Sequence, residues 1–308
     1  MAHLMVVQCS GRRKGYTASL MQAVVDSLQN RDNLEIETYH VHDYQFGPCT
    51  SCFQCIKQVG SGCILDDDWG RNGQGILYRA FKRANALLMV DPVHGWGISS
   101  AARLFMERIY PTFWEGVPYG LPFASISCAS NQGFQYRATE EFCKLSASHA
   151  FRYIGGLPVH AAYIDRAYQK ACELGARLAD AAIDDERNGR KKLTDEEIFL
   201  MYNGTPWDII DGYIQNLTNN SFTYEDSVPV KALAEGKVNN IEAREHMVNV
   251  CEHFKLALDH YNRQDRQAAA RELALVAKFW THATYKQYCE GITVKADIPK
   301  TYRPLDEV

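Results

Sequence analysis

The first part of the chain alternates short apolar runs with amphipathic segments. Residues 3–9, HLMVVQC, form an apolar run, and a polar loop then leads into Tyr16 to Leu28, where Leu20, Val24 and Leu28 recur at helical spacing. Further strands are predicted at 34–41, 86–90, 123–128 and 159–163, and further helices at 76–83, 99–109, 139–149 and 165–184. Strands that alternate with helices in this way predict an α/β fold with an open parallel sheet covered on both faces.

The pattern changes after residue 184. The polar stretch 184–192, DDERNGRKK, is predicted to be a linker, and the strand signal almost disappears beyond it. Thr194 and Glu197 predict a capping box before an apolar helix that ends at 203–206. Helices are also predicted at 209–217, 241–262 and 265–290, the last two as an antiparallel hairpin, and the tail from Ile298 is expected to be irregular. We therefore expect an α/β domain at 1–187 and an α-helical extension at 188–308.

Composition narrows the class of protein. The 308 residues are 46% hydrophobic and 23% charged, as in soluble globular proteins, and their number suits two domains. A net charge of −4 offers no excess positive field, so we expect neither nucleic acid nor a membrane surface as partner. No apolar run approaches the roughly 18 residues that span a bilayer, and the N-terminus does not read as a signal peptide. A cytoplasmic location is expected.

Cysteine is the one unusual component. Four of the ten cysteines follow the spacing Cys49-x2-Cys52-x2-Cys55-x7-Cys63. In a reducing compartment such a cluster indicates a metal or redox site rather than disulfides. Four thiolates suit a [4Fe–4S] cluster, zinc is the competing metal, and a cysteine loop without metal is the third alternative. The remaining cysteines are expected in the core: Cys9, Cys128, Cys143, Cys172, Cys251 and Cys289.

The loop from Ser10 to Thr17 separates the first predicted strand from its helix. Backbone N–H groups at a helix N-terminus, together with hydroxyl and cationic side chains, suit a phosphate. The loop matches neither G-x-x-x-x-G-K-[ST] nor G-x-G-x-x-G, so it lacks the fingerprints of nucleoside triphosphate and Rossmann sites. An ordinary strand–helix turn with solvated basic residues is the alternative.

Three segments resemble one family in the same order along the chain. Ser10 to Leu20 is similar to the GSPR-x-GNT-x-x-L loop of the NADPH-dependent FMN reductase and iron–sulfur flavoprotein family. Residues 91–99, DPVHGWGIS, with 105–108, FMER, resemble that family's TPVYWG-x-[VM]S…F-x-DR segment. The cysteine run resembles the cysteine motif of the iron–sulfur flavoproteins. The resemblance covers about residues 3–185.

This resemblance implies a flavodoxin-like, doubly wound, five-stranded parallel sheet that binds FMN. The FMN phosphate would be held by Ser10, Arg12, Lys14, Gly15, Tyr16 and Thr17. The isoalloxazine would be bordered by Pro92, Val93, His94, Gly95 and Trp96 and by Ser130, Asn131, Gln132 and Gly133. A [4Fe–4S] cluster would be held by Cys49, Cys52, Cys55 and Cys63. The chain departs from the family at Tyr16 (usually Asn), at Asp91 (usually Thr) and at Gly95-Trp96 (usually Trp-Gly).

The resemblance implies an FMN-dependent oxidoreductase that reduces a small, aromatic or quinone-like acceptor, with electrons from NAD(P)H or a ferredoxin-like donor. His94 is the candidate side chain for contact with substrate or flavin. The alternative is that His94 is an ordinary loop residue without such a role. Aromatic residues at Trp96, Tyr110, Phe113 and Trp114 are a candidate roof over such a substrate, and packing in the core or at a subunit interface explains them at least as well. The alternatives are an electron-transfer flavoprotein without a small substrate and a flavin-free metal or redox sensor. A homo-oligomer is expected.

The extension carries one further pattern. Glu245-His246, Glu252-His253 and Asp259-His260 recur every seven residues, which places successive pairs about 10 Å apart along a helix. A metal would therefore need a partner such as Glu272 or His282 from another helix. The favoured interpretation is a solvated or interface-flanking stripe beside the core face of this helix. The extension is expected to cover the flavin site, with an oligomer interface as the alternative.

Overall fold

Five parallel strands form one sheet in the order β2-β1-β3-β4-β5 in the computed structural model, which describes residues 1–290. The strands are β1 (Ala2–Gln8), β2 (Leu34–His40), β3 (Ala86–Pro92), β4 (Pro122–Ala129) and β5 (Arg152–His160). The central strands β1, β3 and β4 are apolar and almost entirely buried, as strands covered on both faces must be. This strand order is that of flavodoxin, and it confirms the predicted fold.

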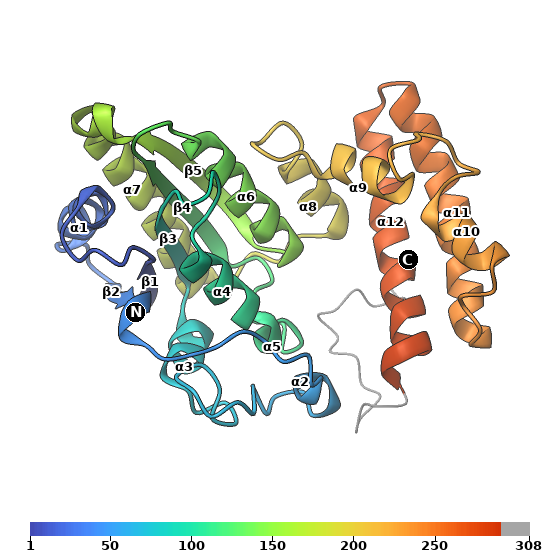
Figure 1. Cartoon of the computed structure of the whole chain (residues 1–308), viewed down its shortest axis with the longest axis horizontal. Coiled ribbons are helices and arrows are strands. Elements are labelled where there is room, and N and C mark those ends of the chain that lie inside the picture. Colours follow the sequence, from blue (N-terminus) through green and yellow to red (C-terminus); the bar gives the residue numbers. More distant parts are fainter. Residues whose placement is uncertain (291–308) are drawn as a thin grey trace. The chain divides into compact units, whose positions relative to one another are not determined.

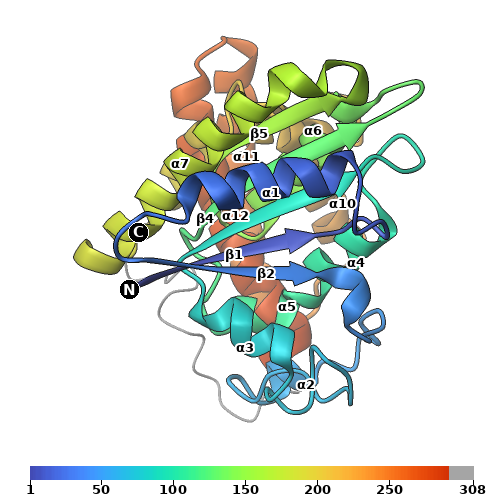
Figure 2. The same ribbon diagram turned by 90° about the vertical axis from the view of Figure 1, so that its left-hand side faces the viewer.

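Helices cover both faces of the sheet. Leu4 and Val6 face one layer, formed by α1 (Tyr16–Leu28) and α7 (Ile164–Asn188), and Figure 2 shows α1 lying in front of the strands. Met5 and Val7 point the other way, toward α3 (Ile76–Arg83), α4 (Ser100–Arg108) and α6 (Gln135–Ser148). The period of two in strand side chains thus gives each face its own apolar core.

Some predicted boundaries are wrong. The fifth strand was expected at 159–163 but runs from Arg152 to His160, because Gly155-Gly156 and Pro158 interrupt its apolar pattern. Proline is tolerated there because β5 lies at the sheet edge. Helix α6 begins four residues before the predicted position, and α7 continues to Asn188, so the first half of the predicted linker is helical.

Four short elements gave no periodic signal in the sequence. They are the 3₁₀ turns η1 (Val41–Asp43) and η2 (Ala161–Tyr163) and the single-turn helices α2 (Gln54–Lys57) and α5 (Tyr110–Phe113). Each is too short to show a helical repeat.

Contacts along the chain divide it into two units, drawn in Figure 1. The first comprises Met1–Cys55 and Val59–Lys192, and the second comprises Ile56–Gln58 with Leu193 and the residues after it. The helices of the second unit are α8 (Asp195–Met201), α9 (Ile209–Leu217), α10 (Val228–Ala234), α11 (Ile241–Asn262) and α12 (Arg266–Thr284).

The second unit follows most of its predicted pattern. Thr194 and Glu197 form the predicted capping box at the start of α8, and α11 and α12 pack against each other as a hairpin. Helix α10 was missed, and the last predicted helix ends as a π-helical turn at Tyr285–Cys289. The prediction for the tail from Ile298 lies outside the described residues. Across residues 1–290, no helix is both long and apolar enough to span a membrane.

Candidate functional site

The carboxyl ends of β1, β3 and β4 bring the three predicted loops to one edge of the sheet. Gln8 pairs with Val90, and Pro92 pairs with Cys128, so these strands end side by side. The strand order reverses between β1 and β3, and open α/β sheets bind their ligands at such a switch point. The predicted residues of the 10–17, 92–96 and 130–133 loops therefore share one edge.

The loop after β1 has the features of an anion site. Ser10 and Thr17 are buried, and the Ser10 hydroxyl accepts a hydrogen bond from the Arg12 N–H at 3.1 Å. Gly15 precedes α1 and offers no side-chain cap, so the first N–H groups of the helix face the loop. Arg12 and Lys14 are exposed at the same loop, whereas Arg13 is paired with Asp43. This combination of hydroxyls, helix N–H groups and cations fits the FMN phosphate.

A buried acid anchors the loop after β3. Asp91 is completely buried and accepts hydrogen bonds from the Ser99 N–H at 2.9 Å and the Ser99 hydroxyl at 2.5 Å. Burial raises the pKa of Asp91 to about 7, although both hydrogen bonds from Ser99 lower it. Ser99 is also the N-cap of α4, so one residue joins the acid, the loop and the helix.

The tip of this loop is a tight turn. His94 and Gly97 exchange backbone hydrogen bonds of 3.0 and 3.1 Å. The two residues between them, Gly95 and Trp96, have φ values of 56° and 67°, so both are left-handed. Such a turn costs little at glycine but strains a tryptophan, and it holds the Trp96 side chain out in solvent. His94 is also exposed.

Trp96 stacks on a residue that the sequence did not single out. Its ring lies 4.6 Å from that of Phe134, at an interplanar angle of 10°. Phe134 comes from the loop after β4, and both rings remain substantially exposed. Of the other candidate roof residues, Tyr110 and Phe113 both pack on Trp114, in keeping with the packing alternative.

Glu141 on α6 also ties the turn in place, and no sequence pattern marked it. Its Oε2 accepts the Ile98 N–H at 3.0 Å, and its carboxylate is paired with Arg103. A Cβ at position 97 would lie 2.6 Å from the same Oε2. A side chain at position 97 would therefore displace the Glu141 carboxylate from the turn.

The four clustered cysteines line a cavity of about 390 Å³. Cys49 and Cys52 are exposed, Cys55 and Cys63 are partly buried, and Tyr110, Pro111 and His149 complete the walls. Burial and the neighbouring thiols raise the pKa of Cys55 to about 12. A bound cation reverses this effect, because it stabilises thiolates.

The two candidate metal sites need different spacings between their cysteine sulfurs. A tetrahedral zinc site with Zn–S bonds near 2.3 Å requires sulfurs roughly 3.8 Å apart. Among residues 1–290, metal-ligand atoms from three or more residues come within 4.8 Å of one another only at His3, Glu35 and Glu37. Each thiolate of a [4Fe–4S] centre binds a different iron, so that site needs sulfurs spread around a space. Four thiols around one open cavity fit such a cluster.

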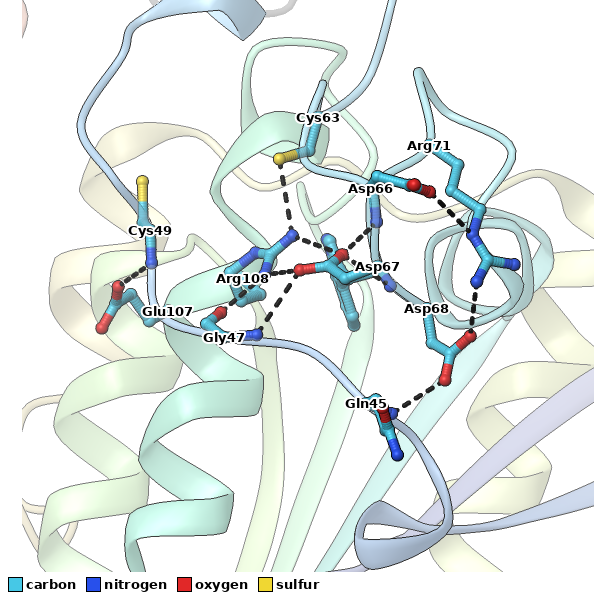
Figure 3. A network of polar contacts seen from close by, with 12 residues as sticks. Gln45, Gly47, Cys49, Cys63, Asp66, Asp67, Asp68, Arg71, Glu107 and Arg108 are labelled. Atoms are coloured by element: carbon cyan, nitrogen blue, oxygen red, sulfur yellow. Dashed lines mark hydrogen bonds and ion pairs between the residues drawn. The ribbon is translucent and has the colours of Figure 1, made fainter.

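Arg108 attaches the cysteine loop to the sheet domain (Figure 3). It forms a bidentate ion pair with Asp67 and donates to the Gly47 carbonyl at 2.6 Å and to Cys63 Sγ at 3.4 Å. Although burial opposes this, the hydrogen bonds from Arg108 help hold the pKa of Asp67 below its ordinary value. The preceding residue, Glu107, accepts the Cys49 N–H at 2.7 Å.

The remaining cysteines behave largely as predicted. Cys9, Cys128, Cys143 and Cys251 are buried, and Cys172 is partly buried. Burial raises the pKa of Cys128 to about 11, so its thiol stays neutral beneath the phosphate loop. The side chain of Cys289 lies outside the described part of the chain.

Two other acid–histidine groups have local partners. Glu37, which lies near His3, already binds Arg83 at 2.5 Å and the Tyr39 hydroxyl at 2.7 Å. In the helical unit, His253 Nδ1 lies 2.8 Å from Glu272, and the His246 and His282 rings are 5.7 Å apart. These contacts pair α11 with α12.

Residues 2–153 match the model of the NADPH-dependent FMN reductase family. An iron–sulfur flavoprotein of Methanocaldococcus jannaschii is 26% identical over 102 residues, which cover 33% of this chain and 49% of the relative. An iron–sulfur flavoprotein of Archaeoglobus fulgidus is 29% identical over 106 residues, which cover 34% of this chain and 50% of the relative. The chain thus spans about half the length of these curated relatives.

Among solved structures, an FMN-dependent NADH-azoreductase of Bacillus anthracis in complex with FMN superposes with a TM-score of 0.43 at 14% identity. The match covers 58% of this chain and 100% of that chain.

Asp91 makes stability depend on pH. Its pKa is about 7 in the folded chain, above its ordinary value of 3.8. Between about pH 4 and pH 7 the carboxyl is therefore protonated in the folded chain and ionised in the unfolded chain. Its contribution to the free energy of unfolding should therefore fall by about 2 to 3 kcal/mol between pH 5 and pH 8. Asp91→Asn should remove this loss, as measured by urea unfolding at both pH values. An identical pH dependence in the two proteins would contradict the assignment.

Proposed function

We propose, from the match of residues 2–153 to the NADPH-dependent FMN reductase family, that this chain is an FMN-dependent oxidoreductase of the iron–sulfur flavoprotein kind. It takes electrons from NAD(P)H or a ferredoxin-like donor and passes them to a small planar acceptor. The observation that carries the proposal is the convergence of the phosphate loop and the two flanking loops at the switch point of the sheet.

Different loops are proposed to bind the phosphate and the ring of FMN. Ser10, Arg12 and Thr17, with the N–H groups at the start of α1, hold the phosphate, because a dianion needs both donors and positive charge. Pro92 to Trp96 and Ser130 to Gly133 border the ring. When bound, FMN supplies the hydride and one-electron chemistry, and the protein positions it and tunes its surroundings. His94 is placed to contact the ring or the acceptor from the same turn.

The four clustered cysteines are proposed to hold a [4Fe–4S] cluster. Support comes from the four thiols around one cavity and from relatives named iron–sulfur flavoproteins. The side chains of Cys55 and Cys63 are less exposed to solvent than those of Cys49 and Cys52.

The stacked pair Trp96 and Phe134 indicates the type of acceptor. Two exposed, nearly parallel rings at the flavin edge offer a flat apolar surface. A planar ring gains about 0.5–1.5 kcal/mol by offset stacking on such a surface, beyond the area that it buries. An aromatic or quinone-like acceptor fits this surface.

A second function has its own supporting observation. Cys49 and Cys52 are exposed, so a cluster on these ligands lies within reach of a protein partner. In that case the chain relays electrons between FMN and this partner and binds no small acceptor. A quinone that fails to reoxidise the reduced holoprotein favours the relay.

The contribution of the phosphate to FMN binding can be tested by comparing FMN with riboflavin, which has the same ring but no phosphate. Arg12→Ala should weaken FMN binding about tenfold or more, because it removes a charge-assisted contact, and should leave riboflavin binding unchanged. Arg13→Ala removes the same charge from the same loop, but its guanidinium is already paired with Asp43, so it should have a much smaller effect. Fluorescence titration of the apoprotein measures both affinities. Equal loss of FMN and riboflavin affinity in Arg12→Ala would contradict the phosphate assignment.

The acceptor surface can be tested at Phe134. Phe134→Leu keeps an apolar side chain and removes the ring, so the KM for 2-methyl-1,4-naphthoquinone should rise about two- to tenfold. Stopped-flow reoxidation of the dithionite-reduced holoprotein measures this without assuming a donor. Tyr136→Leu is the matched control, since Tyr136 is exposed two residues away. Equal KM values in the wild type and both variants would show that the acceptor does not stack there.

A further inference from the structure

Arg108 is a buried cation whose contacts all reach the cysteine loop. It is the last residue of α4, and its side chain is only 1% exposed. Its Nη1 lies 2.6 Å from the Gly47 carbonyl and 2.7 Å from Asp67 Oδ2. Its Nη2 lies 3.0 Å from Asp67 Oδ1 and 3.4 Å from Cys63 Sγ, and Figure 3 shows the guanidinium between these groups.

The surroundings of Arg108 explain how this charge is buried. Asp67 neutralises it through two parallel hydrogen bonds, the geometry that a planar guanidinium prefers with a carboxylate. Asp67 is itself fixed by the N–H groups of Trp69 and Gly70, at 3.1 and 2.7 Å. With the carboxylate satisfied and oriented, one N–H of Arg108 remains directed at the sulfur of Cys63.

The contacts also span the cysteine loop. Gly47 lies two residues before Cys49, Cys63 is the last cysteine of the run, and Asp67 follows it by four residues. Arg108 thus connects the start of the loop with its end and attaches both to α4. Because the guanidinium donates from a rigid fork, a lysine ammonium cannot reproduce the three contacts together.

We propose that Arg108 is a positioning residue for the fourth cysteine and, through its N–H···S hydrogen bond to Cys63, raises the reduction potential of the cluster held there. This inference rests on the [4Fe–4S] cluster of the proposed function. A hydrogen bond to a ligand sulfur favours the reduced cluster, because reduction adds negative charge to the iron–sulfur unit. Asp67 balances the charge of Arg108, so the effect arises from the directed N–H group.

The test compares three variants of the anaerobically reconstituted, FMN-loaded chain. Arg108→Lys keeps a cation, and Arg108→Met combined with Asp67→Asn removes the ion pair without leaving an unpaired buried carboxylate. Arg71→Met is the matched control, because Arg71 lies in the same loop but is exposed and pairs only at 3.4 Å with Asp66 and Asp68. Thermal unfolding checks that each variant is folded, and iron and acid-labile sulfide are counted.

The decisive readout is the midpoint potential of the cluster, from a redox titration followed by electron paramagnetic resonance. Both Arg108 variants should have a lower midpoint potential than the wild type. At the wild-type midpoint, the ratio of reduced to oxidised cluster should fall about tenfold, which corresponds to 59 mV for one electron. Arg71→Met should retain the wild-type potential. Loss of iron from a folded Arg108 variant, with iron kept by Arg71→Met, supports the positioning role.

Folded Arg108 variants with full iron content and the wild-type potential would overturn the inference. A wild-type chain that binds FMN but no iron after reconstitution would instead contradict the proposed cluster, and the inference would fall with it.

Discussion

Helix α4 connects the two candidate sites because each of its ends is fixed by a buried polar contact. At its start, Ser99 caps the helix and donates two hydrogen bonds to Asp91 at the carboxyl end of β3. At its end, Arg108 pairs with Asp67 and holds the cysteine loop. Nine residues of α-helix span about 13 Å. The helix therefore sets a short separation between the loop after β3 and the cysteine loop.

Packing along α4 keeps this separation constant. Phe105 is fully buried and meets the Trp69 ring edge-on at 5.0 Å, so the segment after the cysteines rests on the middle of the helix. Breaking the Arg108–Asp67 pair would leave a charge without its partner in this packed layer, and such losses typically cost about 3–5 kcal/mol. This packing limits changes in the distance between the loop after β3 and the cysteine loop.

The sequence predicted the fold and the location of the site better than the contacts within the site. Apolar runs and helical spacing placed β1, α1, α3 and β3 within a residue or two, because buried parallel strands and amphipathic helices have clear periods. The strand β5 was misplaced, since its glycines and Pro158 carry no apolar pattern. Loop motifs located the sheet edge and the cysteines, and the parallel sheet brought the loops together.

The contact partners of individual site residues could be identified only from the tertiary structure. Phe134 stacks on Trp96 across two loops, and Glu141 reaches the turn from α6, so neither is near its partner in the sequence. Arg108 lies in a segment that resembles the family motif, but its contact with Cys63 joins residues 45 positions apart. Local spacing contains no information on such pairs, which arise only when the sheet and α4 are assembled.

The most direct test of the two-site account is the absorption spectrum of the anaerobically purified full chain, together with its flavin, iron and acid-labile sulfide content. The account predicts flavin absorption bands with one FMN and about four iron atoms and four sulfides per chain, as a single [4Fe–4S] cluster requires. A chain that lacks either flavin or iron after incubation with FMN, ferrous iron and sulfide would contradict it.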